Sequence, residues 1–388
     1  MPLNLFSLNK IREILSVARF DRQELSGSLG DLGTFLPLIL GLSAVAGLSF
    51  PAMLFWAGAA NIATGLTFAI PMPVQPMKAI AAVALSEGMS SGEVYASGLI
   101  MALFMLLIWS TNFTKYLDKI MPKIVVRGIQ FTIGLKLFIK GAQMIYLKEF
   151  IALDSIIVGL IGIGFTLLFY KSNKVPMALI LFVAGIAITL FADRALLLSL
   201  SFQPYIPDMI SIGFDSFRGG FIKGAIPQLP LTLLNSVIAV SALSYSLFPK
   251  HGAATRKISL SVGLMNLTCL FGAMPMCHGS GGLAAQSRFG ARTNGSILLL
   301  GTGKLLAAII FGSSLLPIVS AFPESLLGVL LIIAGLELIL TVKNVRGYFN
   351  IIIVLVIATI TIIGSSLTIG FSVGVILYLI GRTKFFRK

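Results

Sequence analysis

The chain has 388 residues, of which 57% are hydrophobic and only 11% are charged. A soluble domain carries about 25% charged residues, so this composition excludes one and indicates a protein that crosses the membrane many times. The net charge of +15 has two interpretations, which are basic cytoplasmic loops or attraction of an anionic ligand.

Fourteen apolar segments follow a basic amphipathic segment, residues 1–23, which we expect to lie on the membrane surface. Each crossing with its loop would take about 27 residues. The first seven segments span roughly 30–48, 51–70, 76–86, 92–110, 124–146, 151–170 and 176–192. The second seven span roughly 224–246, 258–272, 279–287, 295–316, 325–341, 349–364 and 367–381. Because seven is odd, the two sets run in opposite directions through the membrane.

This pattern predicts an all-α polytopic membrane protein with fourteen transmembrane segments in two inverted seven-segment repeats. The repeats are residues 1–193 and 223–388, and an outer linker, 194–222, joins them. An inside N-terminus places most of the 29 basic residues in inner loops, whereas the reverse orientation places them outside. We therefore expect a multi-pass protein of the cell (inner) membrane with both termini in the cytoplasm, and little charge left over to identify a substrate.

Two polar interruptions carry the most information, residues 71–78 (PMPVQPMK) and 275–282 (PMCHGSGG). They lie about half a chain apart, and each leads from an apolar segment into small residues. Proline and glycine there would break a helix inside the membrane and start a new half-helix. Broken helices in corresponding positions of two halves indicate the binding site of a transporter, although simple helix kinks are the alternative.

Half-helices beginning at Pro76 and Gly279 would expose unpaired backbone N–H groups at the positive end of the helix dipole. In inverted repeats the two ends face each other near the midplane and form an anion site. Gly279 and Gly281 allow close approach of a ligand to the backbone. Three neighbours add side-chain hydrogen-bond donors: Gln75, His278 and Ser280.

Lys78 is expected one turn into the first half-helix, where burial of an unpaired cation costs at least ~2.5–3.5 kcal/mol. It either serves the anion or is structural, through snorkelling or a pair with a carboxylate such as Asp31. Asp31 itself has three interpretations: a helix cap, an ion pair or a carrier of the coupling proton. Thr34, in the same glycine-rich segment, is grouped with it as a coupling or structural residue.

A polar stripe opens the second repeat. Gln228, Thr232 and Asn235 recur at i, i+4 and i+7, so they would share one helix face and offer neutral donors to a tetrahedral oxyanion. The alternative is hydrogen bonding between helices, which is common in membrane bundles. Gln228 and Asn235 are the stronger candidates for contact with the ligand.

Other classes of site have weak support. Cys269, Cys277 and His278 lack the usual spacing of metal ligands, so no metal is expected. The glycines at 279–282 lack the Gly-Lys-Ser/Thr ending of a phosphate loop, which argues against nucleotide binding. No Ser-His-Asp order or carboxylate pair suggests catalysis, so the chain is not expected to be an enzyme or to hold a cofactor.

Four motifs resemble signatures of the molybdate transporter family, a branch of the sulfate permease superfamily. They are residues 30–34 (GDLGT), 71–79 (PMPVQPMKA), 229–237 (LPLTLLNSV) and 275–293 (PMCHGSGGLAAQSRFGART). The resemblance implies a core domain, about 27–112 and 223–316, that moves against a gate domain, about 120–193 and 324–382. The substrate would lie between the third and tenth segments.

The chain departs from its wider relatives at two points. Sulfate permeases commonly end in a soluble regulatory domain, and this chain stops at Lys388. Related nucleobase and bicarbonate carriers place a carboxylate in the eighth segment, where this chain has Asn235. A neutral stripe suits a dianion, because a carboxylate would repel it, but it removes an obvious proton carrier and leaves the coupling ion open.

The sequence thus predicts a secondary active transporter of molybdate or a closely related tetrahedral oxyanion. The nearest alternative is a broader sulfate-type anion transporter; an anion channel and a membrane enzyme are further alternatives. The expected partners are a small inorganic oxyanion and the lipid bilayer, with no nucleic acid and with a homodimer left open.

Overall fold

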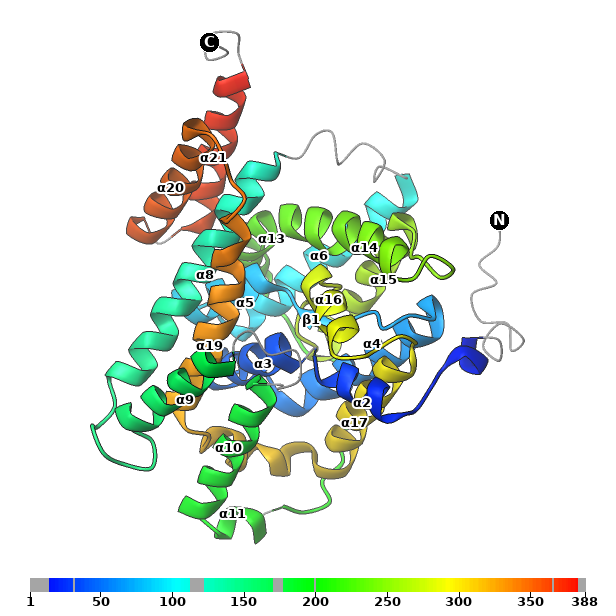
Figure 1. The fold of residues 1–388 in the computed structure, drawn as a ribbon, viewed down its shortest axis with the longest axis vertical. Helices are drawn as coiled ribbons and strands as arrows, with labels where there is room; N and C mark the ends of the chain where they lie inside the picture. Colours follow the sequence, from blue (N-terminus) through cyan, green and yellow to red (C-terminus); the bar gives the residue numbers. More distant parts are fainter. Residues whose placement is uncertain are drawn as a thin grey trace.

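The computed structural model describes residues 14–30, 32–111, 122–169, 177–198, 200–364 and 366–382, which are mostly helical. One group of helices forms a column in Figure 1. Its members are α8 (Lys123–Tyr146), α9 (Ile156–Phe169), α10 (Met177–Ala192), α19 (Glu324–Ile339), α20 (Tyr348–Ile363) and α21 (Leu367–Arg382).

A second group lies beside this column. It contains α2 (Arg22–Leu29), α4 (Phe50–Phe68), α6 (Ser91–Thr111), α13 (Ile226–Leu231), α14 (Val240–Leu247), α15 (Thr255–Leu267), α16 (Ser280–Arg288) and α17 (Gly295–Phe311). Helices α3 (Leu32–Ala46) and α5 (Lys78–Glu87) lie between the two groups (Figure 1) and pack against members of both. Further short helices are α11 (Ala195–Leu198), α12 (Phe214–Gly219) and α18 (Leu316–Ser320).

Glycines fix the closest helix contacts. A Cβ added to Gly134 of α8 would lie only 2.6 Å from the carbonyl oxygen of Gly335 in α19, and the reverse contact is equally close. One more pair, Gly141 and Gly328, meets two turns away in the same two helices. Small residues let the backbones of membrane helices approach and gain van der Waals contact. Helices α8 and α19 therefore pack in a single fixed register.

The two polar interruptions meet as short strands. Strand β1 (Gln75–Pro76) pairs antiparallel with β2 (Met276–Cys277), so the all-helical expectation is wrong at this point. Asn266 of α15 holds β2, because its Oδ1 accepts from the Met276 N–H at 2.9 Å and its Nδ2 donates to the Met276 carbonyl at 2.6 Å.

This pairing shifts both half-helices from their predicted starts. Pro76 lies in the strand and is not the first helical residue, because the strand register opposes it to Met276. The Met77 N–H donates to the Pro275 carbonyl at 2.8 Å, which keeps Met77 extended. Helix α5 consequently begins at Lys78, so that residue lies at the helix start and not one turn inside it. Helix α16 begins at Ser280, with Gly279 as its N-cap.

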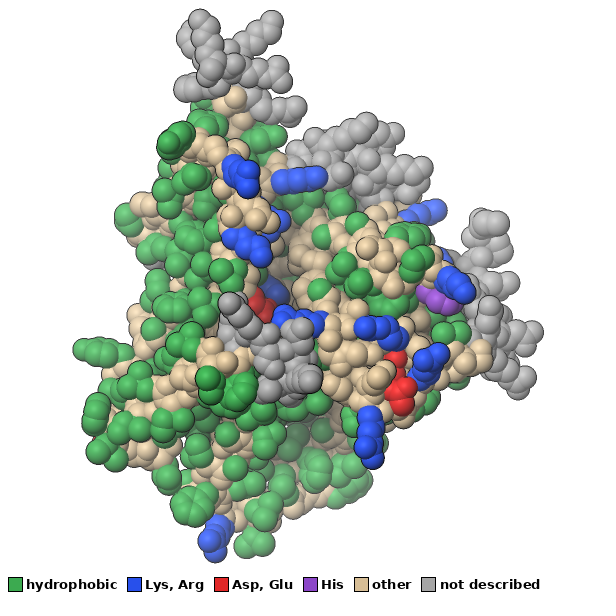
Figure 2. Space-filling view, viewed as in Figure 1, with side chains coloured by type: hydrophobic (Ala, Val, Ile, Leu, Met, Phe, Trp, Pro, Cys, Tyr) green, Lys and Arg blue, Asp and Glu red, His purple; other side chains and the backbone are tan. Residues whose placement is uncertain are grey.

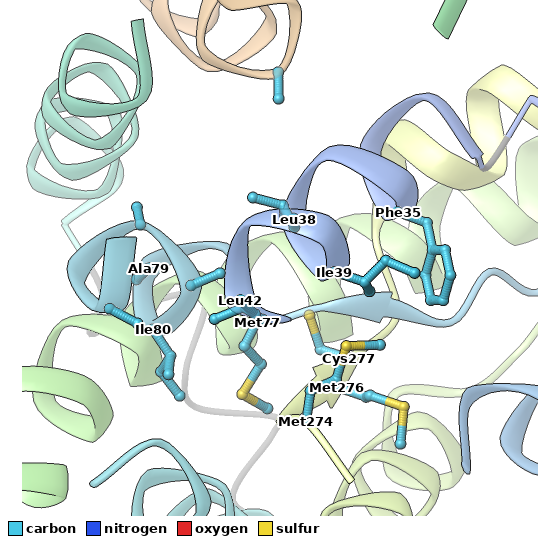
Figure 3. Close-up of a cluster of buried hydrophobic side chains, with 14 of the residues drawn as sticks. Phe35, Leu38, Ile39, Leu42, Met77, Ala79, Ile80, Met274, Met276 and Cys277 are labelled. Carbon is cyan, nitrogen blue, oxygen red and sulfur yellow. The ribbon is translucent and has the colours of Figure 1, made fainter. Parts of the chain in front are cut away.

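Buried apolar side chains surround the paired strands. Figure 3 shows Met77, Met274 and Met276 on the strand side of α3, where Ile39 and Leu42 face them, whereas Leu38 points away. These side chains are at most 1% exposed. Unbranched methionines fill irregular space well, and here they fill the gaps where two strands cross a helix. The crossing is therefore embedded in the apolar interior.

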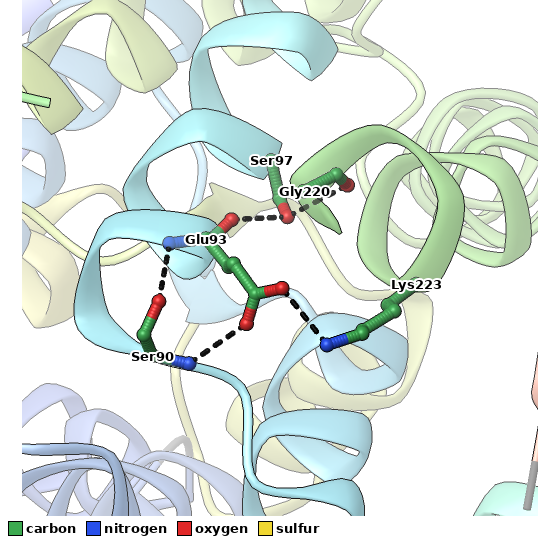
Figure 4. Close-up of polar contacts among 5 residues, drawn as sticks. All are labelled: Ser90, Glu93, Ser97, Gly220 and Lys223. Atoms are coloured by element: carbon green, nitrogen blue, oxygen red, sulfur yellow. Dashed lines mark hydrogen bonds and ion pairs between the residues drawn. The ribbon is translucent and has the colours of Figure 1, made fainter. Parts of the chain in front are cut away.

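The eighth segment begins earlier than the sequence indicates. A continuous helical run covers Phe214–Leu247, so the last third of the predicted linker, 194–222, is helical. The run includes two π-helical stretches, η1 (Gly220–Ala225) and η2 (Thr232–Ala239). Its start is fixed against α6, as Figure 4 shows, because Lys223 pairs with Glu93 at 2.8 Å and the Ser97 hydroxyl donates to the Gly220 carbonyl at 3.0 Å.

Within the described ranges, four helical runs are long and apolar enough to cross a membrane by themselves. They are Ser91–Thr111, Phe214–Leu247, Gly295–Ser320 and Glu324–Val342, and α2 with α3 would add a fifth as a bent pair. Four apolar helices, α9, α10, α20 and α21, have only 14 to 16 residues. A multi-pass helical membrane fold is clear, whereas the number fourteen stays a prediction.

Candidate functional site

A cavity of about 960 Å³ lies between the starts of the two half-helices and the helical column. One wall is formed by the starts of α5 and α16 and by η2, and the opposite wall by α8, α10 and α19. Figure 2 shows Lys and Arg side chains gathered around a hollow on this face. The polar lining comprises Lys78, Lys123, Arg127, Gln130, Asn235, Ser280, Arg288, Glu337, Thr341 and Lys343. Five of these ten are basic, so the cavity favours an anion.

The start of α16 offers backbone to the cavity. No side chain caps this helix at Gly279. A Cβ at Gly281 would meet nothing within 4 Å, so this position faces open space. The Ser280 hydroxyl donates to Asn235 Oδ1 at 2.6 Å, which ties the half-helix to η2. The structure thus brings together three residues that the sequence predicted for the site, with an accessible helix N-terminus of the kind that binds anions.

The start of α5 is arranged differently. Lys78 is half-buried and faces the cavity. The next amide, of Ala79, donates to Gln228 Oε1 at 2.9 Å, and Gln228 Nε2 donates to Thr232 Oγ1 at 2.9 Å. Gln228 therefore caps α5 from a neighbouring helix. One of the helix-end donors expected for the anion is already used.

Only Asn235 of the predicted polar stripe lines the cavity. Gln228 and Thr232 are 2% and 0% exposed and lie behind the cavity wall. A π-helix closes i→i+5 hydrogen bonds and has more residues per turn than an α-helix. Because η2 begins at Thr232, the i, i+4, i+7 rule no longer places these residues on one face. The expectation of a shared site-facing stripe is therefore wrong.

A second set of predicted residues lies behind the helix starts. Gln75 is buried and donates from Nε2 to Thr34 Oγ1. Gly279 packs on Gln75, since a Cβ at Gly279 would overlap Gln75 Oε1. Gly279 thus gives room to a buried side chain, and its role in the approach of a ligand stays a prediction. Gln75, Thr34, Gly279 and the strand residue Pro76 are absent from the cavity lining.

His278 is fully buried and joins the two interruptions. Its Nδ1 lies 2.8 Å from the Pro73 carbonyl oxygen and its Nε2 lies 3.0 Å from Ser261 Oγ. A carbonyl only accepts, so we assign the proton to Nδ1 and let Nε2 accept from the serine hydroxyl. Phe68 packs edge-on against the ring, with 5.8 Å between centroids. His278 therefore fixes the fold behind the site and does not line the cavity; Asp31 lies outside the described residues.

Sequence reasoning missed two polar residues of the opposite wall, Glu337 on α19 and Gln130 on α8. Glu337 stands alone in an apolar segment, 325–341, and an ionisable residue inside a membrane segment is a functional candidate by default. That signal was available in the sequence. Four basic residues assigned to inner loops also line this cavity: Lys123, Arg127, Arg288 and Lys343.

Comparison with solved structures shows the fold. SLC26A9 superposes with a TM-score of 0.65 at 14% identity over 92% of this chain, which spans 64% of the length of that protein. The transmembrane domain of the cyanobacterial bicarbonate transporter BicA gives 0.63 at 16% identity, covering 91% of this chain and 97% of that domain. The murine A9 member of solute carrier family 26, an anion transporter in the inward-facing state, gives 0.70 at 13% identity, covering 95% and 70%.

Comparison of sequences shows the family. The model "Molybdate transporter of MFS superfamily" matches residues 23–137 and 220–338. Molybdate transporter 2 of Arabidopsis thaliana is 40% identical over 92% of this chain and 86% of its own length. Molybdate transporter 1 of Chlamydomonas reinhardtii is 31% identical over 85% of each chain. The chain therefore belongs to the molybdate transporter family.

Proposed function

We propose that this protein is a secondary active transporter of molybdate or a closely related tetrahedral oxyanion. The observation that carries the proposal is the cavity at the start of α16. There an uncapped helix N-terminus, Lys78 and Asn235 converge beside four further basic residues. The molybdate transporters that match most of this chain supply the substrate class.

In the proposed site the anion lies between Lys78 and the first turn of α16. The N–H groups of Ser280 and Gly281 would donate to its oxygens, with the positive end of the helix dipole behind them. Asn235 would donate through Nδ2, because its Oδ1 already accepts from Ser280. Lys78 would supply the full positive charge, and charge-assisted hydrogen bonds are the strong ones.

The proposed architecture has fourteen segments in two inverted repeats, with a core domain that carries the half-helices against a gate domain. Helix packing supports it. We count α3 as the first segment and each half-helix as one segment. Helix α4 packs on α17, and α6 packs on α15. The first contact joins the second and eleventh segments, and the second contact joins the fourth and ninth. Segments two and nine correspond in the two repeats, as do four and eleven, so each contact is the counterpart of the other. The fifth and twelfth segments, α8 and α19, are counterparts of each other in the two repeats, and they also pack together.

For orientation we propose an inner-membrane protein with cytoplasmic termini, whose cavity opens to the cytoplasm. Lys123, Arg127, Arg288 and Lys343 all line the cavity, and basic residues gather on the cytoplasmic side. Cysteines introduced near Arg387 and at residues 203–208 should label from opposite sides. Labelling of both from outside would reject this topology.

Uptake into liposomes tests the function. Purified protein should accumulate labelled molybdate, and excess unlabelled molybdate or tungstate should compete. Phosphate is protonated near neutral pH, so at least one of its oxygens is a hydroxyl, and it should compete poorly for a site built from hydrogen-bond donors. Protein-free liposomes and the Gly281→Val variant serve as controls, and uptake that does not exceed protein-free liposomes would reject the proposal.

A broader sulfate-type transporter is the second candidate, because the fold is shared with SLC26A9. The neutral Asn235 and the exposed helix end suit any tetrahedral dianion. The same uptake assay separates the two candidates. Competition by sulfate at the concentration at which molybdate competes would favour the broader transporter.

A further inference from the structure

Glu337 occupies an unusual position in the cavity. It is the one acidic side chain among the described lining residues, beside five basic ones. Its side chain is exposed to the cavity. Within the described residues it makes no hydrogen bond and no ion pair at contact distance, and it interacts electrostatically with Lys78. A carboxylate has thus been placed opposite the cation proposed to bind the oxyanion.

Among the described residues, the other ionisable side chains that line the cavity are all basic. Helix α8 presents Lys123 and Arg127, α5 presents Lys78, and α16 presents Arg288. Lys343 follows α19 itself. The other helices packed on α19, which are α3, α9 and α10, contain no ionisable residue in their described ranges. Lysine and arginine side chains ordinarily titrate well above neutral pH, so a carboxylate is the group that changes charge on the acidic side.

The carboxylate of Glu337 lies on the opposite wall from Lys78, which gives it a possible part in transport. Lys78 belongs to the half-helix wall, whereas Glu337 belongs to α19, which is locked to α8 by the two glycine pairs. A dianion that binds at Lys78 must approach the carboxylate, and like charges repel strongly in a site of low dielectric. A neutral Glu337 removes this repulsion and still offers a hydroxyl donor.

We propose that Glu337 is the proton-binding residue that couples oxyanion transport to protons. This inference rests on the proposed function. With Glu337 ionised and the anion absent, the carboxylate offsets the charge of Lys78. When the oxyanion binds, Glu337 takes up one proton from the solvent that fills the cavity. The proton leaves again after the oxyanion has been released, so each dianion is accompanied by one proton.

The test measures molybdate binding to the purified full-length protein by calorimetry between pH 6 and pH 8. Above the pKa of Glu337 the wild-type affinity should fall about tenfold for each pH unit, as expected for uptake of one proton. The variant Glu337→Gln should bind with an affinity that does not change with pH. The control Glu324→Gln removes an acid from the same helix outside the cavity, where it pairs with Lys148, and should keep the wild-type pH slope.

Two further measurements keep the test decisive. Titration of wild-type protein in buffers of different ionisation enthalpy counts the protons taken up, which needs no variant, and one proton per molybdate is expected. In liposomes a proton gradient should drive molybdate accumulation by wild type, whereas Glu337→Gln should exchange molybdate without responding to the gradient. A wild-type proton count of zero, an unchanged pH slope in Glu337→Gln, or loss of binding in that folded variant would overturn the inference. Absence of molybdate binding by wild type at every pH would instead reject the proposed function.

Discussion

The two half-helices start in corresponding motifs but present different chemistry to the same cavity. Helix α5 begins with the charged Lys78, and its next amide is capped by Gln228. Helix α16 has no charged residue in its first turn and no side-chain cap, and it opens onto the cavity at Gly281. One start supplies a charge and the other supplies backbone donors. Inverted halves therefore need not contribute equally to a shared site.

The largest effect is expected when the backbone donors of α16 are blocked. Gly281→Val places a branched side chain in the open space at the start of α16, and we expect molybdate binding to become undetectable by calorimetry. The matched control is Gly303→Val on α17, where an added Cβ also meets nothing within 4 Å. Full-affinity binding by folded Gly281→Val would mean that the anion does not lie on this helix end.

A negative charge introduced at Asn235 should have the next largest effect. Asn235→Asp keeps the acceptor for the Ser280 hydroxyl but places a negative charge beside the ligand. At ~4 Å and an effective dielectric of ~20, the repulsion is on the order of 4 kcal/mol for each charge pair before relaxation. We expect transport at matched expression to fall more than about a hundredfold, and far more than for Asn235→Ala. Equal transport by wild type and Asn235→Asp would place Asn235 away from the anion.

Removal of the charge from the α5 side should weaken binding without abolishing it. Hydrogen bonds to charged groups contribute about 1.5–3 kcal/mol, so Lys78→Gln should lower the molybdate affinity roughly tenfold to hundredfold. Lys140→Gln on α8 is the control, since Lys140 is not part of the cavity wall. An unchanged affinity in Lys78→Gln would mean that α5 contributes no charge to the binding of the anion.

A milder change at α16 separates its hydroxyl from its backbone. Ser280→Ala removes one neutral hydrogen bond, a net difference of about 0.5–1.5 kcal/mol, so the affinity should fall about tenfold at most. Ser372→Ala on α21, whose hydroxyl donates to the Thr368 carbonyl, should have no effect. A loss as large as that of Gly281→Val would assign the site to the Ser280 side chain and not to the backbone.

The smallest effect is expected far from both helix starts, in the loop between α8 and α9. Burial raises the pKa of Asp154, whereas hydrogen bonds from Ser325 and the ion pair with Lys148 lower it. The lowering effects together are larger, so the pKa of Asp154 lies below its usual value. Its contribution to stability is therefore present above the unfolded pKa, near ~3.9, and is lost as pH falls through the folded pKa.

Thermal melting of Asp154→Asn checks this point. The variant should be less stable than wild type by about 1 kcal/mol or less at pH 7, with a smaller difference near pH 3. Its molybdate affinity at pH 7 should equal that of wild type. A change in affinity would mean that this loop communicates with the half-helix starts.

The sequence identified the half-helices because their signals are local. Proline, glycine and Lys78 interrupt apolar runs, and such interruptions can be recognised in the sequence without knowledge of the fold. The exact starts were missed by one or two residues because Pro76 pairs with Met276. That pairing joins residues about half the chain apart, so no local pattern contains it.

The direction of individual side chains was harder to predict. The stripe rule failed because π-helical turns at Thr232 change the face that each later residue occupies. Gln228 met the amide of Ala79 rather than the cavity, which depends on how α13 packs on α5. Glu337 was visible as an acid in an apolar segment, but its orientation into the cavity follows from the close packing of Gly134 on Gly335. Rotation of a helix about its axis is a property of its partner as much as of its own sequence.

The pairing of β1 with β2 has a consequence for biogenesis. Each strand has two residues, far too few to persist without its partner. Roughly 200 further residues must be synthesised after β1 before β2 exists, which takes about 10–40 s at 5–20 residues per second. Throughout that interval Lys78 and the polar backbone of residues 71–77 belong to an incomplete helix bundle. Insertion factors that shield a polar interruption during this delay should therefore matter more for this chain than for a membrane protein of simple hairpins.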